Sequence, residues 1–81
     1  MTVMVLSLQS VKHSPLSPKE KTQFVRFLAL RRGFPSLRAL AEACGVTYEH
    51  LRYVILGERE SRVLKQKLIR FLGPEVREVW E

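Results

Sequence analysis

The 81-residue sequence contains no Asp and no Asn, and its single cysteine is Cys44. One thiol cannot form an intramolecular disulfide, and it cannot supply a zinc site by itself. No second histidine, Asp or cysteine is spaced to complete a metal site or a catalytic triad with His13 or His50. We therefore expect no metal, no cofactor and no enzymatic activity, and a reducing, cytoplasmic setting.

Long apolar runs are also missing. The apolar stretch at residues 3–6 is far shorter than the roughly 20 residues that span a bilayer. It also lacks the basic flank and the cleavage site of a secretory signal. A membrane partner is not expected, because the apolar stripes of the chain are needed to build a core.

Positive charge is what the chain has in excess. Fourteen Lys and Arg against eight Glu give a net charge of +6, while 46% hydrophobic residues suffice for one core. A small basic domain suits a polyanion such as nucleic acid, although solubility alone also accounts for such a charge. The excess is uneven: residues 1–35 carry six basic and one acidic side chain, whereas residues 36–57 carry two of each. If DNA is the partner, the flanks of the segment 36–57 must bind the phosphates.

Helix start and stop signals divide residues 17–81 into four or five short helices. Ser17-Pro18-Lys19-Glu20 combines an N-cap, a proline at the first helical position and a capping box. This first helix should end near Arg32, where Gly33 can adopt the left-handed conformation. The later N-caps and glycine stops are Ser36 and Gly45, Thr47 and Gly57, and Ser61 and Gly73. The expected fold is a compact all-α domain.

Apolar residues at helical spacing predict the core of this domain. They are Phe24, Phe27 and Leu28 with Val25 beside them, then Leu37, Leu40, Ala41 and Cys44, then Leu51, Val54 and Ile55, and finally Leu64, Leu68, Phe71 and Leu72. A last short turn over residues 75–80 carries Val76, Val79 and Trp80. These three either close the bundle or form a dimer contact, and we favour the dimer contact because an apolar terminal turn gains most against a partner.

Residues 1–16 lie outside this pattern. The segment 2–11 is β-branched and apolar, which favours an extended conformation over a helix. It is either a strand paired across a dimer, an arm on the domain or a frayed terminus, and residues 12–16 form a linker.

Residues 36–57, SLRALAEACGVTYEHLRYVILG, predict two helices joined by a tight turn. Ala41 is small where the helices cross, and Gly45 allows a backbone conformation that a Cβ opposes. This pattern resembles the lambda repressor/Cro-like (XRE) family of helix-turn-helix proteins, and the resemblance covers residues 17–72. The matching residues are Ser36, Leu40, Ala41, Gly45, Val46, Thr47, Leu51, Val54 and Gly57.

The resemblance implies a five-helix bundle that places the helix 47–56 in the DNA major groove, usually as a two-fold dimer on a palindromic operator. The base-contacting positions of the family correspond to Tyr48, Glu49 and Tyr53, with Arg52 beside them. One position departs from the family. Leu37 stands where a glutamine often braces the recognition helix and contacts phosphate, so Arg38 or another residue must make that contact.

The helical wheel also places Glu49, Arg52 and Tyr53 opposite the core face, with Tyr48 at the edge and His50 at the border between the core and the groove. Arg52 can bind guanine O6 and N7, rest on a phosphate or pair with Glu49. Glu49 can accept from cytosine or stay solvated. The tyrosines can contact thymine methyls and phosphates, or pack against each other or against a protein partner.

Backbone contacts are expected from the N-caps Ser36 and Thr47, from Arg38, and from Arg59 and Arg62 after the reading helix. Capping alone, or a solvated basic face, also explains these residues. The sequence thus predicts a dimeric, sequence-specific DNA-binding transcriptional regulator. The alternative is a protein-interaction module on the same fold, such as an antitoxin-like partner, an anti-repressor or a small phage factor acting on the transcription machinery.

Overall fold

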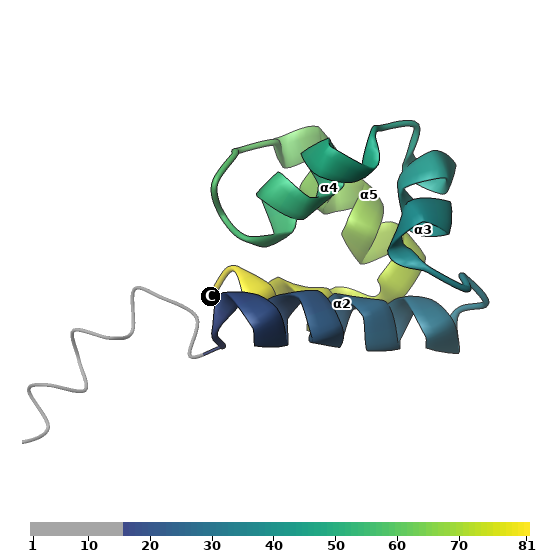
Figure 1. The fold of residues 1–81 in the computed structure, drawn as a ribbon, viewed down its shortest axis with the longest axis horizontal. Coiled ribbons are helices and arrows are strands. Elements are labelled where there is room, and N and C mark those ends of the chain that lie inside the picture. The colour runs from purple at the N-terminus through teal and green to yellow at the C-terminus, as the bar shows by residue number, and fades with distance from the viewer. Residues whose placement is uncertain (1–15) are drawn as a thin grey trace, which may run out of the picture.

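Four α-helices and one 3-10 helix follow one another along residues 16–81, the part of the chain that the computed structural model describes. They are α2 (Pro18–Arg31), α3 (Leu37–Cys44), α4 (Tyr48–Ile55), α5 (Arg62–Leu72) and η1 (Pro74–Val79). In Figure 1, α2 runs along one side of the bundle, η1 returns beside it, and α3, α4 and α5 lie across them. The prediction of an all-α domain is confirmed, and the N-terminal arm lies outside the described residues except for Leu16.

All four predicted N-caps are present. The Ser17 hydroxyl accepts from Glu20 N at 3.2 Å, and the Glu20 carboxylate accepts from Ser17 N at 2.9 Å, which completes the capping box. The side chains of Ser36, Thr47 and Ser61 accept from the backbone N–H three residues on in the same way. Each of the four α-helices therefore begins where a short polar side chain satisfies an amide that has no partner within the helix.

The turn between α3 and α4 depends on Gly45. This residue has φ of +76°, in the left-handed region, and its N–H donates to Glu42 O at 3.0 Å. A Cβ there meets no atom within 4 Å, so the conformation itself, rather than crowding, favours glycine. The predicted left-handed stop is confirmed, and it lets α4 begin only four residues after α3 ends.

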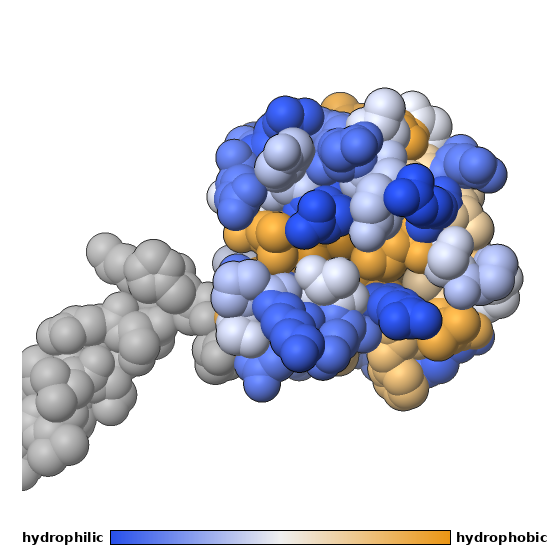
Figure 2. Space-filling model, in the orientation of Figure 1, coloured by the Kyte–Doolittle hydropathy of each residue, from blue (hydrophilic) through white to orange (hydrophobic). Residues whose placement is uncertain are grey.

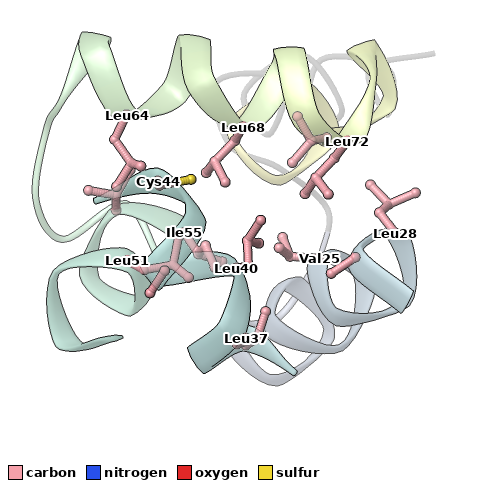
Figure 3. Packing of buried hydrophobic residues seen from close by; sticks show 14 of the residues in the cluster. Val25, Leu28, Leu37, Leu40, Cys44, Leu51, Ile55, Leu64, Leu68 and Leu72 are labelled. Carbon is pink, nitrogen blue, oxygen red and sulfur yellow. The ribbon is translucent and has the colours of Figure 1, made fainter. Parts of the chain in front are cut away.

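The core is the shared interior of the helices (Figure 3). The stripe predicted for α3 is confirmed, because Leu37, Leu40, Ala41 and Cys44 are all buried. In α2 the prediction is partly wrong. Val25, Leu28 and Ala29 are buried, whereas Phe27 is 54% exposed. Apolar residues occur around much of α2, and the packing against α3, α4 and η1 selects the face that contains Val25.

The preferred prediction for the C-terminal turn is also wrong. Val76 and Val79 are fully buried within the domain, and Trp80 packs against its core. The indole Nε1 of Trp80 donates to the carbonyl oxygen of Val54 at 2.8 Å. These residues close the bundle, because an internal acceptor for the indole and an internal apolar surface both lie within reach.

Candidate nucleic-acid interface

The outward face of α4 is the face expected to read DNA. Glu49, Arg52 and Tyr53 are exposed, while Leu51, Val54 and Ile55 on the opposite side are buried. Tyr48 and His50 are half-buried at the two edges. The wheel position predicted for each of these residues is therefore confirmed, whereas the role of each side chain is a separate question.

Tyr48 lies against two arginines. The guanidinium carbon of Arg38, on α3, is 4.4 Å from the centre of the Tyr48 ring, and that of Arg52 is 5.9 Å from it. Both distances are within the range of cation–π attraction. Among the described residues Arg52 makes no ion pair with Glu49, so the pairing considered from the sequence is not seen. Tyr48 thus joins α3 to α4 and gathers two positive charges at the start of α4.

Tyr53 and His50 form a second cluster, with a single arginine, at the end of the same face. The guanidinium carbon of Arg59 is 4.8 Å from the Tyr53 ring centre. Arg59 Nη1 also donates to His50 Nδ1 at 3.0 Å. Two side chains of α4 therefore hold an arginine of the following loop beside the outward face. The two tyrosines pack against arginines and not against each other.

An open pocket of about 250 Å³ adjoins the first cluster. Its lining comes from α2, from the start of α3 and from α4, and consists of Thr22, Arg26, Ser36, Leu37, Arg38 and Tyr48. Two arginines and the start of α3 make this pocket positive. On the face drawn in Figure 2, polar side chains lie over the first part of α2 and over α4, and apolar surface lies between them and over the far end of α2. Leu37, the position at which the sequence departs from the family that it resembles, is 7% exposed and belongs to the core.

Sequence reasoning missed Thr22, Arg26 and His50 as members of this region. Thr22 donates its hydroxyl to Pro18 O at 3.1 Å and also lines the pocket. Arg26 lies on a different helix from the motif, so only the tertiary structure brings it near Arg38. The position of His50 on the wheel, at the border of the core, was its sole signal.

The remaining predicted backbone contacts are less concentrated. The side-chain oxygens of Ser36 and Thr47 accept from backbone N–H groups as N-caps, and capping is the role that the structure shows for them. Arg62 begins α5 and is exposed, but the contacts within residues 16–81 do not join it to either cluster.

Two basic residues of α5 serve the fold. Lys65 Nζ pairs with Glu60 at 3.2 Å and lies 5.1 Å from the Trp80 ring centre. Lys67 Nζ donates to Cys44 O at 3.0 Å, at the C-terminal end of α3 where the helix dipole favours a cation. Burial raises the pKa of the Cys44 thiol, and the positive charge of Lys67 opposes that effect. Cys44 is 1% exposed, as expected for a core residue.

Within residues 16–81, no three His, Cys or Glu side chains lie close enough to hold a metal ion. No helix in this range is long and apolar enough to cross a membrane. No protein-family model matches the chain, and no curated protein or solved structure matches it either. A functional assignment therefore depends on the geometry just described.

Proposed function

We propose that this protein is a sequence-specific DNA-binding transcriptional regulator of the lambda repressor/Cro-like helix-turn-helix class, with α4 as the reading helix. The observation that carries the proposal is the outward face of α4, where Glu49, Arg52 and Tyr53 are exposed, with Arg38 against Tyr48 at its start and Arg59 against Tyr53 at its end. An α-helix with its side chains is about 10–12 Å wide, which matches the B-DNA major groove of about 12 Å. A short, exposed helix of this kind can enter the groove with its polar face first.

The link between α3 and α4 supports this reading. The two helices are separated by three residues around Gly45, and the contact between Arg38 and Tyr48 joins them on the outer side. A helix that reads bases must keep its register against the helix that rests on the backbone. The buried stripe of α3 and the turn at Gly45 supply that rigidity.

In this proposal, different residues read the bases and bind the phosphates. Within α4, Arg52 is the single basic residue, and Glu49 offsets its charge. Phosphate neutralisation then falls to arginines around the helix, namely Arg26, Arg38 and Arg59, with Arg62 on α5. Because each neutralised phosphate releases counterions, the logarithm of the affinity should fall by about 0.9 per phosphate for each tenfold rise in salt.

A second candidate is a protein-interaction module. The observation that favours it is the same pair of clusters, because tyrosines and arginines dominate the energetics of protein interfaces. Glu49 also faces outward, where it would be repelled by DNA phosphates unless it meets a cytosine amino group. In this reading α4 binds an acidic protein surface, and duplex DNA is not its partner.

Selection of bound duplexes from a random pool tests the first proposal, followed by salt titration of the selected site. Arg52→Ala should lower the preference for the selected site by about 1–3 kcal/mol. Arg59→Ala should weaken the selected and the scrambled duplex alike. Arg77→Ala is the matched control, since Arg77 is an exposed arginine on η1, outside both clusters.

Failure to retain any duplex at low salt contradicts the proposal. An Arg52→Ala variant that discriminates as well as Arg77→Ala does removes α4 as the reading helix. Stoichiometric binding of a defined acidic protein, lost in Arg52→Ala and accompanied by no DNA retention, supports the protein-interaction module.

A further inference from the structure

The outer side of α2 exposes large apolar side chains that the bundle does not use. Phe27 is 54% exposed and Leu30 is 51% exposed, one helical turn apart. Gln23, also exposed, extends the same strip towards the start of the helix. Residues 23, 27 and 30 have the spacing of one face of a helix that packs against another. We call Gln23, Phe27 and Leu30 the α2 strip.

The position of the strip around α2 follows from the helical period of about 100° per residue. Thr22 and Arg26 line the pocket together with Tyr48, so they mark the side of α2 that lies nearest to α4. Phe27 and Leu30 lie about 90° further round the helix than that pair. The strip therefore points away from the core residues Val25 and Leu28, and it lies at about a right angle to the side of α2 nearest α4.

We propose that the α2 strip is the contact between two copies of the chain, with the two α2 helices packed antiparallel about a two-fold axis. The charges at the edge of the strip are self-complementary. Glu20 and Arg31 lie eleven residues apart, about three helical turns, and so share one edge of α2. In an antiparallel pair centred between them, each Glu20 faces Arg31 of the second copy.

Phe27 sits close to the centre of that arrangement. The midpoint between Glu20 and Arg31 is about 2 Å along the helix from Phe27, and a helical side chain leans towards the N-terminus, over that midpoint. The two Phe27 rings then meet at the axis. Arg31 is prepared for this role, since its guanidinium carbon lies 5.6 Å from the Phe27 ring centre. That side chain is 49% exposed, and its contact with Glu75 is as long as 3.9 Å.

This arrangement also suits the proposed DNA binding, and this step alone rests on the proposed function. The two-fold axis is perpendicular to the α2 helix and to the direction in which the strip points outward. It therefore points towards the side of α2 that carries Thr22 and Arg26. Both copies then present α4 on the same side, as one duplex requires. The two Arg26 side chains flank the axis on that side, so they repel each other without DNA and bind phosphates with it.

The contact is small, so the free protein should associate weakly. The test is sedimentation equilibrium without DNA at protein concentrations up to about 1 mM. Phe27→Lys and Leu30→Lys should each raise the dimer dissociation constant at least about tenfold. Val63→Lys is the matched control, because Val63 is an apolar residue of α5 that is 66% exposed and gains the same charge. It should associate as the unmodified chain does.

A charge exchange tests the edge of the contact. Glu20→Lys and Arg31→Glu should each weaken association several-fold, and the double variant should restore it. The melting temperature should not recover in the double variant, because the capping box is still lost. Arg26→Gln should strengthen association without DNA and weaken DNA binding.

A chain that stays monomeric throughout this range overturns the proposal. So does a dimer that Phe27→Lys and Leu30→Lys leave intact, which would place the contact elsewhere or show that residues 1–15 cover the strip. If the chain and its variants associate as expected but no duplex is retained, the α2 contact is supported and the proposed function is contradicted.

Discussion

The helices α2 and α4 bury similar apolar faces, but their exposed faces differ in character: that of α2 carries large apolar side chains and that of α4 carries polar ones. Each contributes three buried apolar residues to one core, namely Val25, Leu28 and Ala29 from α2, and Leu51, Val54 and Ile55 from α4. Outward, α2 shows Phe27 and Leu30, whereas α4 shows Glu49, Arg52 and Tyr53. The fold constrains only the inner faces. The difference between the outer faces is therefore what the two proposals rest on, DNA as the partner of α4 and a second copy of the chain as the partner of α2.

The largest expected effect separates buried from exposed leucines. Leu51→Ala should lower the free energy of unfolding by about 2–5 kcal/mol, because Leu51 is fully buried and its removal leaves a cavity. The same substitution at the exposed Leu30 should cost about 1 kcal/mol or less. Urea denaturation of the two variants measures both values. Equal losses would mean that the outer side of α2 is packed in the free protein.

A second comparison removes one aromatic ring from each outer face. Tyr48→Ala should weaken binding to a selected duplex by about 1–2 kcal/mol, because Arg38 and Arg52 lose the ring that holds them. Phe27→Ala removes the ring beside Arg31 on α2 and should leave discrimination unchanged on a duplex with a single half-site, which binds one copy of the chain and does not need the α2 contact. Fluorescence anisotropy on selected and scrambled duplexes provides the readout. If both variants lose discrimination alike, the two faces do not have separate roles.

The helix η1 is attached differently to α4 and to α2. Trp80→Phe should lower the free energy of unfolding by about 1 kcal/mol, since it removes the hydrogen bond to Val54 O of α4. Glu75→Gln removes the long, exposed ion pair with Arg31 of α2 and should cost less than about 0.5 kcal/mol. Thermal melting of the two variants checks the order. The reverse order would make the α2 side the stronger attachment.

The smallest expected effect is a pH dependence of the folding stability, caused by the buried Cys44 at the C-terminal end of α3. Burial raises the pKa of the Cys44 thiol in the folded chain, so the folded state binds more protons than the unfolded state at alkaline pH. The contribution to stability is complete below about pH 8.5, where an exposed thiol ionises, and is lost as pH rises through the folded pKa. Cys44→Ala should flatten the fall in stability above that pH. Denaturation curves from pH 7 to about pH 10 test this slope.

Local signals made the helices predictable. Ser17, Ser36 and Thr47 cap their helices from within three residues, and Gly45 ends α3 through its own backbone freedom. The face of α2 was less predictable, because the choice between Phe27 and Ala29 depends on helices that arrive later in the chain. Trp80 was mispredicted for the same reason, since its acceptor Val54 lies 26 residues away.

The candidate site shows the same limit. The wheel of α4 sufficed to place Arg52 and Tyr53 outward, because that depends on one helix alone. The contact of Arg38 with Tyr48 joins two helices, and the hydrogen bond of Arg59 with His50 joins a helix to a loop. Neither follows from the periodicity of a single segment. The contribution of Arg26 to the pocket depends on a third helix and was equally hidden.

Titration of the ¹⁵N-labelled chain with a duplex, followed by amide chemical shifts, tests the central claim most directly. If α4 reads DNA, the largest shifts should map to Tyr48, Glu49, Arg52 and Tyr53, with smaller ones at Arg38 and Arg59. The amide of Val63, on the exposed first turn of α5, should move little. Shifts confined to the outer side of α2, without shifts on α4, or no shifts at low salt, would contradict the assignment of α4 as the DNA-reading helix.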